Sequence, residues 1–414
     1  MILSRRVFSL GAMAMGLSAC VGAGGGGRVV GQSLVEPGMT PVPDAGYDAW
    51  VAAFKGRAAA KGIPQGTIDA AFRAAGFLPG VIERDRNQTE FKRSLEDYLS
   101  IAASDERLST GAAAVDQYGS VLNAVEARYG VEGNVVAAVW GLESFFGTRR
   151  GSIPVVAALS TLAYEGRRAA FFEEQLIATL RILQNGDTTP ANMVGSWAGA
   201  MGHTQFIPTS YLSLAVDFNG DGRRDIWSDD PTDSLASTAN YLARSGWTRG
   251  LPWGVEVIVP AGYAGPSGRG NGRSAADWSA AGLRAASGGS LPQAASSLIL
   301  PAGASGPGFL ITSNFNAILR YNNAENYAIG VGHLSDRLRG GGPIRGTFPP
   351  DEFGLTKVQR QSLQQRLTDA GFDTGGTDGV IGNKTKAAIS AYEAARGLAV
   401  TGQPSLDLLR ALGG

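Results

Sequence analysis

The sequence predicts a mainly α-helical protein, and three observations support that fold class. Apolar residues recur at helical spacing over most of residues 47–183 and again over 355–412. Glycines follow several of these periodic segments, as is typical of helix C-termini. Runs with strand character are limited mainly to 255–259 and 298–300.

Length and composition limit the classes of protein to consider. A chain of 414 residues suggests two domains, with room for a third. Its 36 basic and 36 acidic side chains give no net charge, which argues against a nucleic-acid-binding protein. Its 59 glycines indicate many turns and linkers, and its single cysteine excludes an internal disulfide.

The N-terminus has the pattern of an export signal. A pair of arginines precedes an apolar run, Val7 to Leu17, which is too short to span a bilayer. The next residues, Leu-Ser-Ala-Cys, resemble the bacterial lipobox, and the arginines resemble a twin-arginine signal. We therefore expect a lipoprotein signal peptide over 1–19 and a lipid on Cys20. Val21, in place of Asp, favours the outer membrane. The alternative is a plain signal peptide with a chance cysteine.

The remaining elements follow in order. Residues 20–46 are rich in Gly, Pro and Val and are expected to form a flexible tether. Residues 260–308 are rich in Gly, Ser and Ala and are expected to be a loop-rich insertion. The pattern predicts two helices within 48–77 and further helices over 91–101, 111–130, 135–147, 159–162 and 171–183.

The helix that ends near Gly147 carries an acidic residue on an apolar face. Val136, Val139, Trp140 and Glu143 fall at i, i+3, i+4 and i+7, and Gly147 stands where a C-cap glycine is expected. Burial disfavours the charged form of a carboxylate, as a general acid near neutral pH requires. Glu143 is therefore a candidate catalytic acid. The alternative is a carboxylate at the edge of the stripe that reaches solvent or pairs with a neighbouring arginine.

A glycine-rich stretch, 195–211, contains neutral hydrogen-bonding side chains. Its glycines allow the backbone to approach other groups closely. Ser196 and Gln205 are of the kind that orients sugar hydroxyls and amides. A tightly packed structural turn is the alternative.

Residues 217–225 match the first half of an EF-hand calcium loop. Oxygen-bearing side chains alternate before the required glycine, although Ser228 replaces the bidentate Glu of the twelfth position. We expect a structural calcium site; a solvated acidic turn is the alternative. The expected ligands are Asp217, Asn219, Asp221, Arg223 through its carbonyl oxygen, and Asp233 in place of that Glu, with Asp229 or Asp230 as alternatives to Asp233.

Aromatic and amide side chains interleave at Tyr321, Asn322 and Tyr327, which suits stacking on sugar rings; a helix start with its aromatics in the core is the alternative. Residues 341–354, with their glycines and prolines, are expected to be a linker. Residues 355–414 are expected to form a small three-helix unit.

Together these stretches resemble the B-type membrane-bound lytic murein transglycosylases, which have a lysozyme-like helical fold. The resemblance covers about residues 47–340, which would be the catalytic domain. Its motifs are Trp140-Gly141-Leu142-Glu143 with Gly147, Ser196 to Gly202, Gln205-Phe206 with Pro208 and Tyr211, Asp217 to Gly222, and Arg320-Tyr321-Asn322 with Tyr327. The chain departs from the family pattern at His203-Thr204 and Ser228. Residues 355–412 resemble a peptidoglycan-binding domain through Asp378-Gly379-Val380-Ile381-Gly382.

The resemblance implies cleavage of the β-1,4 bond between N-acetylmuramic acid (MurNAc) and N-acetylglucosamine (GlcNAc) in peptidoglycan, without water, leaving 1,6-anhydro-MurNAc ends. Glu143 would act alone, first as acid and then as base. The residues expected to bind the glycan are Ser196, Gln205, Tyr321, Asn322 and Tyr327. Two alternatives are a non-catalytic peptidoglycan-binding adaptor and a hydrolytic muramidase.

The resemblance also implies partners and a location. Peptidoglycan glycan strands are the expected partner, and the membrane is expected to be reached through the lipid on Cys20. No cofactor is expected to be required for the chemistry, and the calcium ion is expected to be structural. The protein is expected in the periplasm as an outer-membrane lipoprotein.

Overall fold

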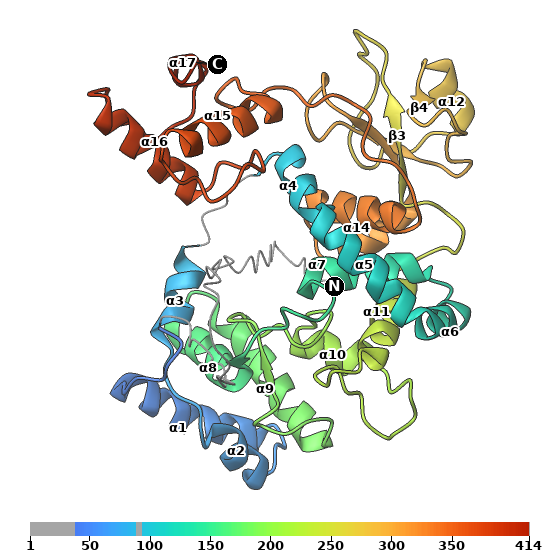
Figure 1. Ribbon diagram of the computed structural model, residues 1–414. Helices are drawn as coiled ribbons and strands as arrows, with labels where there is room; N and C mark the ends of the chain where they lie inside the picture. Colours follow the sequence, from blue (N-terminus) through green and yellow to red (C-terminus); the bar gives the residue numbers. More distant parts are fainter. Residues whose placement is uncertain (1–37, 88–92, 414) are drawn as a thin grey trace, which may run out of the picture. The chain divides into compact units, whose positions relative to one another are not determined.

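The computed structural model describes residues 38–87 and 93–413, and it is mainly helical, as predicted (Figure 1). The described residues form two compact units. Unit 1 contains residues 38–87 and 113–244, and unit 2 contains residues 93–112 and 245–413. The expected signal peptide, Cys20 and most of the expected tether lie outside the described residues.

Helices make up most of unit 1. They are α1 (Ala45–Ala60), α2 (Gln65–Phe72), α3 (Pro79–Arg86), α6 (Gly119–Tyr129), α7 (Gly133–Ser144), α8 (Val155–Glu165), α9 (Ala169–Asn185), α10 (Pro208–Leu214) and α11 (Thr232–Arg244). Two short strands, β1 (Ile153–Pro154) and β2 (Val194–Gly195), pair antiparallel. Asp44 begins α1 by accepting a hydrogen bond from the backbone N–H of Tyr47 at 2.7 Å.

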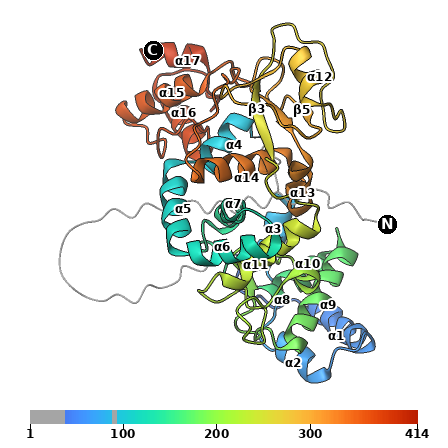
Figure 2. The ribbon, with the colours of Figure 1, turned by 90° about the vertical axis from the view of Figure 1, so that its right-hand side faces the viewer.

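Helix α7 is the central helix of unit 1. It packs against α6 and α11, which lie beside it in Figure 2. The sequence predicts one apolar face, but Val135 to Gly141 are all buried, so the helix is enclosed on nearly every side. A helix that is apolar all round belongs in a core. The expectation of a single apolar face therefore underestimated how much of this helix is buried.

The predicted single helix over 111–130 is wrong. Two helices occupy the region, α5 (Asp105–Gln117) and α6, and α5 continues from unit 2 into unit 1. The chain leaves helical geometry at Tyr118, which has φ −107° and ψ 18°. Gly119 follows, and glycine lowers helix propensity there, which permits a break that periodicity alone does not reveal.

Unit 2 combines helices with a small sheet. Its helices are α4 (Leu95–Ala102), α12 (Ala275–Ala280), α13 (Ser313–Tyr321), α14 (Glu325–Leu338), α15 (Lys357–Asp369), α16 (Asn383–Ala395) and α17 (Leu406–Ala411), and its strands are β3 (Gly254–Ile258), β4 (Arg284–Ala285), β5 (Ser297–Ile299) and β6 (Gly308–Ile311). Helix α14 packs against α4 and α13.

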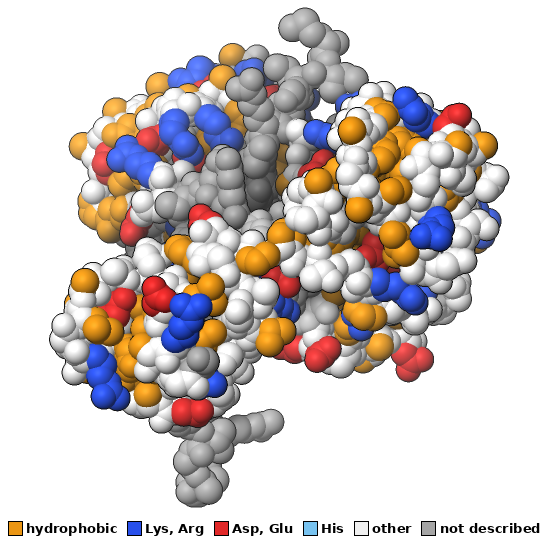
Figure 3. Space-filling view, turned by 90° about the horizontal axis from the view of Figure 1, so that it is seen from above, with side chains coloured by type: hydrophobic (Ala, Val, Ile, Leu, Met, Phe, Trp, Pro, Cys, Tyr) orange, Lys and Arg blue, Asp and Glu red, His pale blue; other side chains and the backbone are white. Residues whose placement is uncertain are grey.

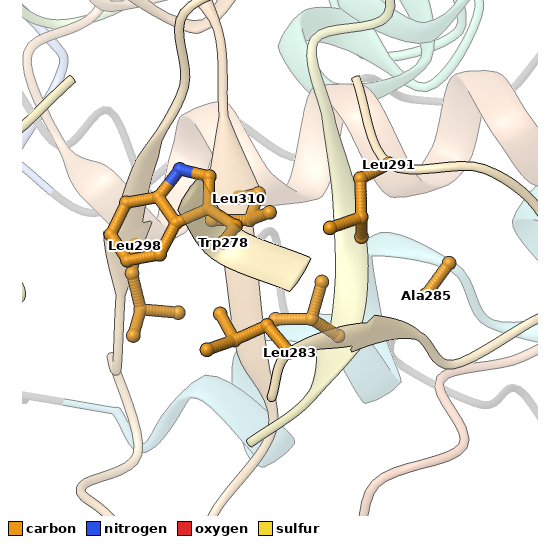
Figure 4. Close-up of a cluster of buried hydrophobic side chains, with 7 residues drawn as sticks. Trp278, Leu283, Ala285, Leu291, Leu298 and Leu310 are labelled. Atoms are coloured by element: carbon orange, nitrogen blue, oxygen red, sulfur yellow. The ribbon is translucent and has the colours of Figure 1, made fainter. Parts of the chain in front are cut away.

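The insertion over 260–308 is loop-rich, as predicted, because α12, β4 and β5 are its only complete helices and strands, but it is a folded part of unit 2 with a core of its own. Its strands join β3 in an antiparallel sheet of order β4-β3-β6-β5. The buried side chains of Trp278, Leu283, Leu298 and Leu310 point toward one another over the sheet (Figure 4). Strands of two to five residues are too short for periodicity to reveal them, so this core is visible only in the fold.

The three C-terminal helices enclose a separate small core. Leu355, Leu363, Leu367, Ile389 and Tyr392 are among its buried members. Helix α15 begins with a capping box, in which the Thr356 side chain accepts from the Gln359 backbone and the Gln359 side chain accepts from the Thr356 backbone.

A buried arginine joins these helices to α4 within unit 2. The side chain of Arg360 is 1% exposed, and its Nη2 lies 3.0 Å from a Glu96 carboxylate oxygen and 2.7 Å from one of Asp97. Its Nη1 lies 3.2 Å from Asp351. In the expected linker, the backbone N–H groups of Arg345 and Gly346 donate to the Glu256 carboxylate. Residues 345, 346 and 351 of the expected linker are therefore held by side chains of unit 2.

Charge is dispersed over the face of the molecule that is drawn in Figure 3. Basic and acidic side chains are both scattered over the face in Figure 3, in keeping with the zero net charge. In the described ranges, no helix has the length and apolar character needed to cross a membrane.

Candidate functional site

The end of α7 is the first part of the site. The helix ends at Ser144, and Phe145 and Phe146 follow in the left-handed region at φ 51° and 55°. The C-cap is therefore Phe145, and the predicted C-cap at Gly147 is wrong. The Ser144 hydroxyl accepts from the Gly147 N–H at 2.9 Å and donates to the backbone oxygen of His203. These bonds end the helix before Gly147 is reached.

Gly147 has a different role in this turn. Its φ is 85°, and a Cβ on it would overlap the ring of His203. A side chain there would be excluded both by backbone conformation and by space. The glycine therefore permits close contact between the end of α7 and the glycine-rich loop.

Glu143 lies in the last turn of α7 and is half-buried. The two arginines that follow have other contacts. Arg150 donates to the backbone oxygen of Trp227 at 2.8 Å and to Asp229 Oδ1 at 2.6 Å. The Arg149 guanidinium lies over the Phe145 ring, 4.3 Å from its centroid. Both guanidinium groups therefore contribute to the structure of the turn after Glu143.

The glycine-rich loop, residues 195–206, is the second part of the site. Ser196 and Ala200 exchange bonds: Ser196 N–H donates to the Ala200 oxygen at 2.8 Å, and Ala200 N–H donates to Ser196 Oγ at 3.1 Å. Gln205 is buried, and its Nε2 donates to the backbone oxygens of Gly202 and Arg150, both at 2.9 Å. Both Nε2 protons of Gln205 are therefore used by the protein backbone.

Backbone strain concentrates in these two segments. Over the described residues, the non-glycine residues with positive φ are Phe145, Phe146 and Gln205, at 51°, 55° and 52°. Such conformations each cost on the order of 1–3 kcal/mol and cluster at functional sites. The structure brings the two segments together, since Gln205 donates to Arg150 and Ser144 donates to His203.

His203 is a site residue that sequence reasoning missed. In the sequence, His203 stands out only because it departs from the family pattern. Its ring is buried, with Nδ1 lying 3.2 Å from Trp140 Nε1 and Nε2 lying 2.8 Å from the Ser228 oxygen. An ionisable ring inside a motif of glycines and small residues is the signal that could have drawn attention to it.

The acidic loop, residues 217–225, folds on itself. Asp217 accepts from the N–H groups of Gly220 and Gly222 at 2.7 and 2.9 Å. Asn219 Oδ1 accepts from Asp221 N–H, and Asp221 Oδ1 accepts from Arg223 N–H. The backbone of the loop therefore curls around its own side-chain oxygens.

Asp233 completes this loop from α11. It is 2% exposed, and burial is the main cause that raises its pKa. Its two oxygens accept from the N–H groups of Phe218 at 2.8 Å and Asp225 at 2.9 Å. Residues 38–87 and 93–413 contain no group of three or more His, Cys, Asp or Glu side chains that could hold a metal ion. The donor set remains oxygen-only, which suits a hard cation.

The other three predicted glycan-binding residues lie in unit 2. Tyr321 ends α13, Asn322 is its C-cap and accepts from Ala324 N–H at 3.2 Å, and Tyr327 is buried in the first turn of α14. Glu325 lies beside them, and burial is the main cause that raises its pKa.

Comparison with known families gives two matches. Residues 46–336 match the family described as the transglycosylase SLT domain. Residues 356–412 match a peptidoglycan-binding domain family. The first match contains the α7 segment, the glycine-rich loop and the α13–α14 segment.

Individual relatives agree with the family match. The chain is 35% identical over 235 residues to membrane-bound lytic murein transglycosylase B of Escherichia coli K12, a match that spans 56% of this chain and 64% of that protein, less than two thirds of its length. It is 45% identical to SltB3 of Pseudomonas aeruginosa, crystallised with NAG-anhNAM-pentapeptide, with a TM-score of 0.72 over 90% of this chain and 100% of that one.

A third relative is more distant. Lytic transglycosylase Slt35 of Escherichia coli, crystallised with calcium, is 28% identical, with a TM-score of 0.61 over 73% of this chain and 96% of that one. The family match alone covers well over half of the present chain. This protein therefore belongs to the transglycosylase SLT family.

Proposed function

We propose that this protein is a lytic murein transglycosylase. It cleaves the β-1,4 bond between MurNAc and GlcNAc of peptidoglycan without water and leaves 1,6-anhydro-MurNAc ends. One observation carries the proposal: the family match covers the Glu143 helix and the glycine-rich loop, which hydrogen bonds hold together. The similar SltB3 was crystallised with an anhydro-muramyl peptide, which is the type of product expected.

In the proposed mechanism, Glu143 serves as both acid and base. It donates its proton to the oxygen that leaves with GlcNAc as the C1–O bond of MurNAc breaks. The resulting carboxylate then takes the proton of the MurNAc C6 hydroxyl as that oxygen bonds to C1. An ordinary glycosidase needs a second carboxylate. Here the substrate's own hydroxyl replaces water, so one carboxylate suffices.

The glycan is bound by neutral side chains in this proposal. Gln205 offers its Oε1, because its Nε2 protons are donated to the protein backbone. Ser196 sits in the same loop, and its hydroxyl helps to shape that loop. The remaining glycan-binding residues in the proposal are Tyr321, Asn322 and Tyr327 of unit 2.

Glu143→Gln tests the mechanism. The amide is nearly isosteric but can neither give nor take the catalytic proton, so we expect turnover of purified sacculi to fall by at least about 100-fold with the melting temperature unchanged. Mass spectrometry of the wild-type products decides the reaction type. An anhydro end is lighter than a reducing end by one water. Reducing ends would support a hydrolytic muramidase, and no release would support a non-catalytic adaptor.

We further propose that residues 356–412 bind peptidoglycan and that the mature protein is a lipoprotein of the outer membrane, lipidated on Cys20. The family match supports the first part. The lipobox-like Leu-Ser-Ala-Cys supports the second. Cys20→Ser in cells should move the protein from the membrane fraction to the soluble periplasmic fraction. Retention in the membrane fraction would contradict the anchor.

Finally, we propose that the acidic loop binds calcium as a structural ion. The residues that would hold it are Asp217, Asn219, Asp221, Arg223 and Asp233. The alternating oxygen donors and the curled backbone of the loop support this proposal. Calcium would neutralise the acidic side chains and fasten the loop to α11, without a part in the chemistry.

A further inference from the structure

We propose that His203 is a positioning residue, which fastens the last turn of α7, with Glu143, to the glycine-rich loop, with Ser196 and Gln205. This inference rests on the proposed function, because it concerns where Glu143 is held for proton transfer. It concerns a residue at which the chain departs from the family pattern that the sequence resembles.

Both ring nitrogens of His203 have polar partners. Trp140 Nε1 lies 3.2 Å from Nδ1, and the Ser228 backbone oxygen lies 2.8 Å from Nε2. The residue is 3% exposed, so these contacts are shielded from water. A buried polar ring with matched partners is fixed in orientation, because rotation would leave the partners unsatisfied.

The partners determine where the proton of the ring resides. An indole N–H only donates, so Nδ1 must accept; a backbone oxygen only accepts, so Nε2 must carry the proton. Arg150 Nη1 also lies 3.2 Å from Nε2, but it bonds to the same Ser228 oxygen at 2.6 Å. The Nε2–H tautomer thus forms hydrogen bonds with two of the three neighbours, Trp140 and Ser228. The Nδ1–H tautomer could form one, with Arg150.

Charge on the ring would break this arrangement. A protonated ring would set two N–H groups against each other at Trp140. Burial is the main cause that lowers the pKa of His203, and it outweighs the hydrogen bond to the Ser228 oxygen, which raises the pKa; Arg150 lowers it further, against the nearby carboxylates of Asp229 and Asp225. The neutral ring is therefore the form that joins the two segments.

The backbone of His203 adds a second attachment. Its oxygen accepts from the Ser144 hydroxyl, which in turn accepts from Gly147 N–H at 2.9 Å. His203 thus contacts α7 at Trp140 and Ser144, which flank Glu143 in sequence on its two sides. A small misplacement of a catalytic group can cost about 100-fold in rate, so such fixation has a kinetic consequence.

Three substitutions separate the two polar roles of the ring from its volume. His203→Asn keeps an oxygen acceptor near the place of Nδ1. His203→Gln keeps an N–H donor near the place of Nε2. His203→Phe keeps the ring shape and removes both. We expect kcat on soluble glycan strands to fall about 100-fold in His203→Phe and about tenfold or less in His203→Asn, with KM changed less than threefold.

The spectroscopic signature is the indole N–H resonance of Trp140, assigned by its disappearance in Trp140→Phe. A lost hydrogen bond shifts this resonance upfield, so we expect an upfield shift in His203→Phe and a smaller one in His203→Asn. The matched control is His333→Asn, because His333 is the other histidine, is also buried and lies in unit 2. It should leave both kcat and the Trp140 resonance near the wild-type values.

The outcomes separate this inference from the proposed function. An active wild type whose His203→Phe variant keeps its kcat, or loses no more than His333→Asn does, overturns the positioning role alone. A kcat of His203→Asn that is no higher than that of His203→Phe would also overturn the positioning role. A wild type that releases no products overturns the proposed function and the positioning role with it. A graded kcat loss with a matching Trp140 shift supports the inference.

Discussion

Two loops of unit 1 both turn at glycines with positive φ but are held in different ways. The glycine-rich loop, residues 195–206, bonds to distant segments: Gln205 donates to Arg150, and His203 contacts Trp140 and Ser144. In the acidic loop, residues 217–223 bond mainly to their own backbone and to Asp233. The remote contact of this loop is made at its end, where Arg224 pairs with Asp187. Both contain glycines at positive φ.

The difference shows what each loop depends on. A loop held by remote partners keeps its shape only while the surrounding fold is intact, so the positions of its side chains also depend on that fold. A loop held by its own side chains is nearly autonomous and tolerates change around it. We therefore expect substitutions of remote contacts to cost much more than substitutions of local ones.

The largest effect is expected in unit 2, where the same contrast recurs between two arginines. Arg360 is buried and pairs with Glu96 and Asp97, which are more than 200 positions away in the chain. Arg410 is exposed and pairs with Asp407, three residues away. Arg360→Met leaves two partly buried carboxylates and the backbone oxygens of Gly379 and Leu355 without this donor, and it should destabilise the protein by about 3–5 kcal/mol. Arg410→Met should change stability by less than about 0.5 kcal/mol.

Urea unfolding of both variants measures this difference. Equal stability losses would show that burial and distance do not separate the two pairs. The result also bears on the expected linker over 341–354. If Arg360 holds the C-terminal helices against α4, Arg360→Met should make the segment after residue 340 more susceptible to limited proteolysis.

The next effect compares one glycine from each loop. Gly202 has φ +72°, and a Cβ on it would overlap the backbone oxygen of Ile226, whereas Gly220 has φ +81° and open space around it. Alanine costs about 1 kcal/mol at either position for its conformation. At Gly202 the overlap adds about 1–3 kcal/mol more, since Ile226 belongs to the packed interior.

Thermal unfolding in chelator compares Gly202→Ala with Gly220→Ala without any effect of metal. We expect the first to be less stable than the second by at least about 1 kcal/mol, with lower activity as well. Equal melting temperatures would mean that the glycine-rich loop can shift to accommodate a methyl group. In that event the loop would not be the rigid support that the contacts indicate.

The same contrast explains what could be predicted from the sequence. The curl of the acidic loop follows from alternating Asp and Asn before a glycine, because its bonds span two to five residues. The presence of helices could be predicted from the apolar periodicity for the same reason, because that pattern is also local in the sequence. The family and the mainly α fold were also predicted, on motifs such as Trp140-Gly141-Leu142-Glu143.

Features that depend on remote partners could not be predicted. Trp140 and His203 are 63 positions apart, so no local pattern relates them. The helix was expected to end at Gly147, but the bond from Ser144 to His203 favours an earlier end, at a cost in strain at Phe145. The core around Trp278 and Leu310 likewise joins strands that are too short to be recognised one at a time.

The smallest effect is expected from calcium, which tests the autonomy of the acidic loop. An ion that binds only the folded state stabilises it by about 1.4 kcal/mol at ten times its Kd. We therefore expect calcium to raise the melting temperature of the wild type by a few degrees, and Asp217→Ala to abolish that rise. Activity of wild type and variant should remain similar, because the hydrogen bonds from Gly220 and Gly222 to Asp217 lie within the loop.

Two results would count against this account of the acidic loop. Identical wild-type melting curves in calcium and in chelator would mean that the loop binds no calcium and that its carboxylates serve only the backbone. A large loss of activity in Asp217→Ala would mean that the loop is coupled to the site near Glu143. Arg150 offers one route for such coupling, since it bonds both to Asp229 and to the Ser228 oxygen that His203 also contacts. Asp229→Asn therefore separates the two explanations: it should lower activity only if the route through Arg150 is used, and it should leave the calcium-dependent rise in melting temperature unchanged.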